Sequence, residues 1–221
     1  MKRTLKVMRV SYPDIKVPQW QGRRLRGFFG SGREADSLLH NHGSEGVQYR
    51  YPLVQYKVIQ QVPTIVAIEE GIPAVYPLVM ESETLRLGNQ EYPCGTVRFD
   101  LRQDTVGDRP DFCEYRFLSP WFALNQTNYH LYQNSSADEK NSLLQKILIG
   151  NILSLAKGLH TTVEFPLHVD CQLRSGTVRF KNEMVTAFWG DFRVNYNLPD
   201  LFGIGKSISR GFGSIKRCNA L

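Results

Sequence analysis

One segment constrains the fold more than any other, a helix-forming stretch that stands among strand-like segments. Residues 136–139 (SADE) have the capping-box pattern, with Ser136 at the N-cap and Glu139 three residues later. Apolar side chains then recur at helical spacing. They are Leu143, Leu144, Ile147, Leu148, Ile152, Leu155, Ala156 and Leu159. Since Gly158 is a suitable helix end, we predict a long helix over residues 136–158.

The segments around this helix are typical of strands, because they alternate in polarity or are rich in aromatic and β-branched residues. They are residues 2–10, 48–59, 63–70, 97–102, 112–118, 169–180, 184–196 and 215–217. Pro52 places its strand near a sheet edge or splits it. Residues 23–40 favour a helix that the glycines at 27, 30 and 32 interrupt or end, and residues 71–88 favour another.

A polar stretch, residues 103–111 (QDTVGDRPD), contains both glycine and proline and is a candidate linker. It divides the 221 residues into an N-terminal domain, 1–108, and a C-terminal domain, 109–221. The elements on each side follow the order strand, helix, strand, strand. We therefore predict an α+β protein of two tandem ferredoxin-like (RRM-like) domains. The two halves share no clear sequence repeat, so this duplication rests on element order alone.

Basic residues are gathered in two segments that contain no acid. Residues 15–33 hold five, among them Arg23, Arg24 and Arg26, and residues 201–221 hold four, in a chain of formal net charge +6. Basic segments rich in glycine and aromatic residues suit a nucleic-acid phosphate backbone. A merely solvated basic face is the open alternative for either segment.

Several other classes of protein are disfavoured. The four cysteines are scattered without a CxxC pair, so we expect no zinc site, and no cofactor is indicated. The N-terminus lacks the apolar run of a signal peptide, and no apolar stretch is long enough to cross a membrane. The expected location is the reducing cytoplasm, with no membrane partner.

A glycine-rich loop near the C-terminus, residues 203–213 (GIGKSISRGFG), has two glycine-apolar-glycine pairs separated by five residues. Asp200 excludes a Walker A loop, and Ile208 excludes a dinucleotide fingerprint. Glycines allow positive φ and close approach, and successive N–H groups can bind an anion. An exposed loop of this kind predicts phosphate contacts, with a tight structural turn as the alternative. The candidate RNA-binding residues here are Gly203, Gly205, Lys206, Ser207, Ser209, Arg210, Gly211 and Gly213.

This loop, placed just before the last strand, resembles the signature of the RAMP superfamily of CRISPR RNA-binding proteins. The likeness is greatest to the endoribonuclease that cuts CRISPR repeat transcripts. Residues 38–54 (LLHNHGSEGVQYRYPLV) look like that family's catalytic-histidine region, and residues 117–120 (FLSP) resemble the strand that opens its second domain. The resemblance implies two tandem ferredoxin-like domains. It also implies metal-independent cleavage that leaves a 2′,3′-cyclic phosphate and a 5′-hydroxyl.

Such cleavage needs a base for the 2′-hydroxyl proton, an acid for the departing 5′-oxygen and a cation for the phosphorane charge. His40 occupies the position that resembles the catalytic histidine, and His42, Tyr49 and Lys57 are candidates for the other roles. The histidines could instead be structural. Three adjacent residues, HNH, do not make the metal-dependent nuclease motif, and Glu45 alone gives weak support for a metal pair.

One departure from the family keeps a second function open. Some members have a lysine about six residues after the histidine, where this chain has residues 45–47 (EGV). A catalytically silent RNA-binding subunit of a CRISPR effector complex is therefore the alternative to the enzyme. A small-molecule enzyme on the same fold is less favoured, because the C-terminus is basic and acid-free. The expected partner is CRISPR repeat RNA, with other CRISPR-associated proteins and a second copy of the chain left open.

Overall fold

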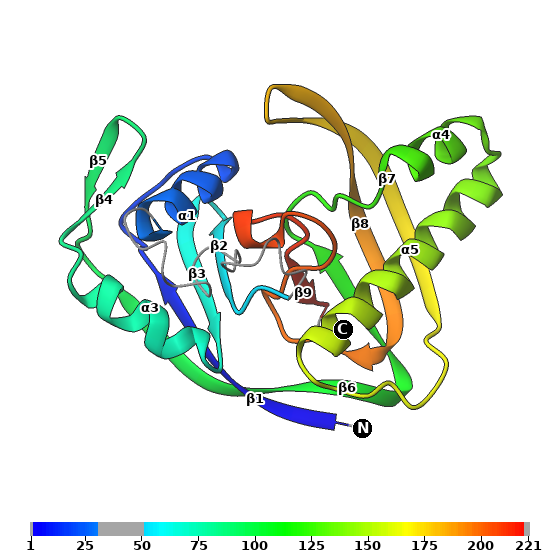
Figure 1. Ribbon diagram of the computed structural model, residues 1–221, viewed down its shortest axis with the longest axis horizontal. Coiled ribbons are helices and arrows are strands. Elements are labelled where there is room, and N and C mark those ends of the chain that lie inside the picture. The colour runs from blue at the N-terminus through cyan, green and yellow to red at the C-terminus, as the bar shows by residue number, and fades with distance from the viewer. Residues whose placement is uncertain (1, 31–50, 219–221) are drawn as a thin grey trace, which may run out of the picture. The chain divides into compact units, whose positions relative to one another are not determined.

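The computed structural model describes residues 2–30 and 51–218 (Figure 1). The chain divides into two compact units. The N-terminal unit comprises Thr4–Asp104 together with Ile208–Gly211. The C-terminal unit comprises Met1–Arg3, Thr105–Ser207 and Phe212–Leu221. Each unit therefore contains a short piece from the opposite end of the chain.

The N-terminal unit is built on three antiparallel strands in the order β2-β3-β1. In the middle strand, Ile65 pairs with Val10 on one side and Tyr56 on the other. Helix α1 packs on β2, and α3 packs on β2 and β3 (Figure 1). The elements of this unit are β1 (Lys2–Ser11), η1 (Gln19–Gln21), α1 (Gly22–Gly30), β2 (Val54–Ile59), β3 (Val62–Ile68), α3 (Gly71–Met80), β4 (Thr84–Leu87) and β5 (Gln90–Pro93).

The core of this unit is one apolar cluster formed by the sheet and both helices. Leu25 and Phe29 of α1 lie four residues apart, on one helix face, and both are buried against the cluster. Val75 and Val79 bring the buried face of α3 to the same cluster. This packing fixes α1 on the sheet, so its remaining faces carry the arginines.

The C-terminal unit contains the long strand β6 (Arg98–Phe117), which begins in the N-terminal unit, and the antiparallel pair of β7 (Val169–Phe180) and β8 (Glu183–Asn197). β6 pairs with β8 and with β9 (Ile215–Arg217). The helices are α4 (Gln126–Asn134) and α5 (Ala137–Gly158), and η2 (Ile208–Arg210) is the short helix that belongs to the N-terminal unit.

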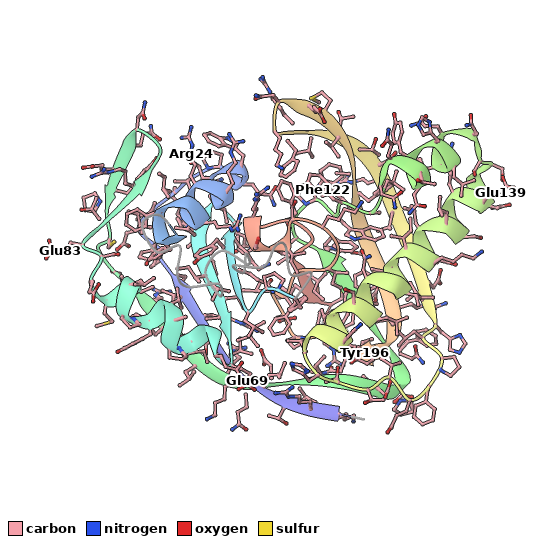
Figure 2. All side chains as sticks on the ribbon, viewed as in Figure 1. Arg24, Glu69, Glu83, Phe122, Glu139 and Tyr196 are labelled. Atoms are coloured by element: carbon pink, nitrogen blue, oxygen red, sulfur yellow. The ribbon has the colours of Figure 1, made fainter. Side chains whose placement is uncertain are left out.

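Helix α5 has the predicted N-terminus. The Ser136 hydroxyl accepts from the Glu139 N–H, and the Glu139 carboxylate accepts from the Ser136 N–H at 2.8 Å (Figure 2). The buried residues Leu144, Leu148 and Ile152 then follow at spacings of four. The prediction of this helix is confirmed, as are the strands predicted at both chain ends and the pair that became β7 and β8.

The predicted linker is wrong. Residues 103–111 belong to β6, and the register of β6 with β8 shifts between Asp108 and Cys113. Gly107, at φ 140°, pairs with Asn197 just before this irregularity. Pro110 lies within it, where the ladder is interrupted and a missing N–H is tolerated. The polarity of the stretch reflects a strand with many exposed side chains.

Three other elements differ from the sequence expectation. The helix predicted over residues 71–88 ends at Met80, and residues beyond it form the β4–β5 hairpin. The strand predicted from residue 48 begins at Val54, after Pro52, while residues 48–50 lie outside the described part of the chain. The third is α4, which was not predicted; residues 31–40 of the helix predicted over 23–40 lie outside the described part of the chain.

Candidate nucleic-acid interface

The histidine cluster lies outside the described residues, so His40, His42 and Tyr49 have no structural description. Of the candidate catalytic residues, only Lys57 is described. The structure describes all the candidate RNA-binding residues, which lie on α1 and in the glycine-rich loop.

Three arginines are positioned by the amphipathic packing of α1. With Leu25 and Phe29 buried in the core, Arg23 is exposed, and Arg24 and Arg26 are partly buried. Arg23 and Arg26 are three residues apart, so they lie on neighbouring positions of one helix face. This face is basic, because it carries both arginines and the first turn of α1 contains no acidic residue.

The structure brings Arg26 close to Arg210, the arginine of η2. The pKa of the Arg26 guanidinium is lowered, first because the side chain is partly buried and second because the positive charge of Arg210 lies nearby. The backbones of α1 and η2 also lie close together, since a Cβ at Gly22 of α1 would lie 3.1 Å from the Arg210 carbonyl oxygen. Both arginines therefore add positive charge to one part of the N-terminal unit, and clustered positive charge suits an anionic ligand such as a phosphate.

Lys57 lies in β2, the strand against which both α1 and η2 pack. A Cβ at Gly211 would lie 3.0 Å from the Tyr56 carbonyl oxygen and 3.4 Å from the Cα of Lys57. The Lys57 side chain is fully buried, and this burial lowers the pKa of its ammonium to about 7. The N-terminal unit therefore holds Lys57 on β2, and it holds Arg26 and Arg210 on α1 and η2, which both pack against β2.

The glycine-rich loop is buried or partly buried at every residue except Lys206, which corrects the expectation that it is exposed. Lys206 is exposed, whereas Gly203, Gly211 and Gly213 are buried. Two amides assigned to phosphate binding donate within the protein, from Gly211 to the Ile208 carbonyl at 3.1 Å and from Gly213 to the Pro120 carbonyl at 2.8 Å. These two N–H groups are thus already satisfied by the fold.

The requirement for glycine at position 213 comes from the protein itself. Its φ is 61°, and a Cβ there would collide with the Ile204 carbonyl oxygen.

The loop's cations and hydroxyls are divided between the units. Lys206 and Ser207 belong to the C-terminal unit, and the Lys206 ammonium donates to the Leu124 carbonyl at 2.8 Å. Ser209 and Arg210 belong to the N-terminal unit.

An aromatic residue of this region was missed by the sequence analysis. Trp20, in η1, is half exposed, and the Arg24 guanidinium lies over its ring, 4.7 Å from the ring centroid. The sequence feature that could have identified Trp20 is its position as an aromatic residue inside the acid-free basic segment, residues 15–33.

The two halves of the chain match the two halves of one protein family. Residues 3–105 match the family model of the Cas6b N-terminal domain, and residues 108–218 match that of the Cas6b C-terminal domain. The chain belongs to the Cas6b family. The two Cas6b matches are separated inside β6, close to the division between the structural units.

Solved structures of Cas6b proteins resemble the whole chain. One crystal structure of Cas6b is 33% identical in sequence, has a TM-score of 0.93, and covers 98% of this chain and 100% of its own. A second, of a CRISPR RNA processing endoribonuclease Cas6b, is 33% identical, has a TM-score of 0.79 and gives the same coverage. These likenesses confirm the predicted fold of two tandem ferredoxin-like α+β units and the RAMP-type family resemblance.

One relative matches about two thirds of the chain in sequence. An uncharacterized protein of Methanocaldococcus jannaschii is 37% identical over 141 residues, which are 63% of this chain and 96% of that protein.

Within residues 2–30 and 51–218, no helix has the length and apolar character needed to span a membrane.

Proposed function

We propose that this Cas6b-family chain is an endoribonuclease that cuts CRISPR precursor RNA within its repeats. The observation that carries the proposal is the Cas6b match over both halves of the chain, together with its likeness to a CRISPR RNA processing endoribonuclease. The proximity of Arg26 and Arg210 supports an anionic substrate, because it gathers positive charge from two distant basic segments.

The proposed reaction uses the nucleophile that RNA supplies. The 2′-hydroxyl loses its proton to a base and attacks the adjacent phosphorus, the bond from phosphorus to the 5′-oxygen breaks, and an acid protonates that oxygen. The products are a 2′,3′-cyclic phosphate and a 5′-hydroxyl, and no water has to be activated by a metal. His40 is the proposed base or acid, and His42, Tyr49 and Lys57 are candidates for the remaining roles.

The ends of the products and the dependence on the 2′-hydroxyl test this mechanism. Repeat RNA incubated with the protein in EDTA should be cut and should carry a 2′,3′-cyclic phosphate. A 2′-deoxy substitution at the scissile nucleotide should abolish cutting while binding persists. Normal cutting of the deoxy substrate would show that the mechanism is wrong. Tight binding without cutting of any repeat would favour the silent RNA-binding subunit.

The role of His40 is tested by single-turnover cleavage of bound RNA. Loss of a general acid or base lowers the rate by roughly 10²–10⁴. His40→Ala should therefore slow cleavage by that order and leave affinity nearly unchanged, with His42→Ala measured beside it. An equal loss of binding, with an unchanged rate for bound RNA, would mark His40 as a contact or structural residue.

The phosphate contacts of the glycine-rich loop are tested by salt titration. We propose that residues 203–213 bind RNA phosphates mainly through Lys206 and Arg210, helped by the Ser207 and Ser209 hydroxyls. Each phosphate neutralised on single-stranded RNA contributes roughly −0.7 to the slope of log K against log salt. The Lys206→Ala, Arg210→Ala double variant should flatten the slope by about 1.4. Unchanged slope and affinity would mean that the loop is only a turn.

A further inference from the structure

Trp20 is an exposed aromatic residue fixed beside the basic face of α1. Half of its surface is exposed, whereas Trp121 is fully buried. It lies in η1, which runs directly into α1. A large exposed aromatic side chain beside a basic helix is a favourable platform for a nucleobase, since every base has a π-face and a phosphate beside it.

The contact with Arg24 holds one face of this ring. The guanidinium lies 4.7 Å from the ring centroid, within the range of a cation–π interaction. The same guanidinium donates from Nη1 to the Leu87 carbonyl at 3.3 Å, at the turn between β4 and β5. Figure 2 labels Arg24 on α1. The hydrogen bond to Leu87 holds Arg24 against the ring, and this contact reduces the freedom that the indole loses when a ligand stacks on it.

The turn between β4 and β5 is shaped to receive Arg24. Gly88 has a φ of 72°, and a Cβ there would lie 2.6 Å from Nη1 of Arg24. A Cβ at this position would displace the end of the Arg24 side chain, so glycine permits the close approach of the guanidinium to the turn. Trp20, Arg24 and Gly88 all belong to the N-terminal unit, so the arrangement is complete within it.

An exposed charge follows the ring three residues along the chain, on the helix that continues from η1. Arg23 is exposed and directly precedes Arg24, which is occupied with Trp20 and Leu87. An exposed guanidinium beside a stacking surface suits the phosphate of the stacked nucleotide. No acid occurs in residues 15–33 to repel that phosphate.

We propose that Trp20 is a stacking platform for one unpaired base of the bound RNA. Arg24 is the positioning residue that fixes the ring, and Arg23 binds the adjoining phosphate. The inference rests on the proposed function, because it assigns a subsite to the same RNA. It also reassigns Arg24 from a phosphate contact to a support of the ring.

The first test measures affinity for repeat RNA made uncleavable by a 2′-deoxy scissile nucleotide. Loss of one stacked base corresponds to roughly 5- to 150-fold weaker binding. Trp20→Ala should weaken binding within that range without changing the salt slope, since it removes no phosphate contact, and Trp20→Phe should retain most of the affinity. Arg23→Ala should flatten the slope by about 0.7. Phe165→Ala, at an exposed aromatic residue of the C-terminal unit, is the matched control and should change neither.

The second test identifies the stacked nucleotide by scanning abasic substitutions through the repeat. At one position the abasic RNA should bind wild type as weakly as Trp20→Ala binds the intact RNA, and combining both changes should cost nothing more. Additive losses at every position, or intact affinity in Trp20→Ala, would overturn the platform while leaving cleavage by the wild type intact. Failure of the wild type to bind repeat RNA at all would instead refute the proposed function.

Discussion

Replacing Lys57 with methionine should change how the stability of the protein depends on pH. Lys57 is fully buried in β2, and its pKa is lowered from 10.5 to about 7 by that burial. In the unfolded chain the side chain is solvated and keeps its ordinary pKa. Between about pH 7 and 10.5 the unfolded state therefore binds one more proton than the folded state. The free energy of unfolding must rise with pH across this window.

The size of this rise follows from the two pKa values. The largest possible slope for one proton is about 1.4 kcal/mol per pH unit. Because Lys57 is itself part-titrated near its folded pKa of about 7, the slope is smaller there. Between pH 7.5 and 9.5 we expect a gain of about 2 kcal/mol from this residue alone. Below pH 7 the ammonium is charged in both states, so the burial cost stays constant.

Urea denaturation of wild type and Lys57→Met at pH 7.5 and 9.5 measures the effect. Buried thiols oppose it, because burial raises the pKa of Cys94 and raises that of Cys171 to about 11, so stability from these groups falls as pH rises. The difference between the two proteins removes their contribution. Lys146→Met, at an exposed position of α5, is the control and should keep the wild-type dependence. Parallel pH dependences of wild type and Lys57→Met would refute the reasoning.

Other predictions concern stability, each measured by urea denaturation. Gly213→Ala should cost several kcal/mol or prevent folding, since the new Cβ would overlap the Ile204 carbonyl oxygen; Gly27→Ala, in α1 with nothing within 4 Å of the added Cβ, should be neutral or stabilising by up to about 1 kcal/mol. Equal effects of the two would contradict the steric argument. Ser136→Ala should cost about 1 kcal/mol by removing the cap of α5, and a matching loss in Ser142→Ala, at an exposed position inside that helix, would argue against capping as the cause.

Features that depend on local sequence were predictable. The capping box, the helical spacing after Ser136 and the alternation in the terminal strands are read within a few neighbouring residues, and the structure contains them. The linker was mispredicted because the pairing of this stretch with β8, including its register shift, depends on the partner strand, whereas Gly107 and Pro110 in isolation are typical of a loop. The helix predicted past Met80 failed for a similar reason, since the β4–β5 hairpin is defined by its own pairing.

The candidate site was predictable only as a set of residue types. Two acid-free basic segments indicated an anionic ligand, but only the tertiary structure places Arg26 beside Arg210. The pattern of β2 is equally misleading, because Gln55 and Lys57 alternate with apolar residues as on a solvated face, yet both are fully buried. The glycines of the C-terminal loop indicated close approach, and the approach at Gly213 is to the protein's own backbone.

The outer edge of β2 has a consequence for synthesis of the chain. β2 ends the strand order β2-β3-β1, and the segment beside it, Ile208–Gly211, lies close to the C-terminus. A nascent chain that has released only the first 104 residues from the ribosome therefore holds β2 without Ile208–Gly211 beside it. An open edge is a template for pairing with other chains. Until η2 is translated, this edge lacks the segment that packs on it in the folded protein, so we expect chains halted before Ile208 to aggregate more readily than the full sequence.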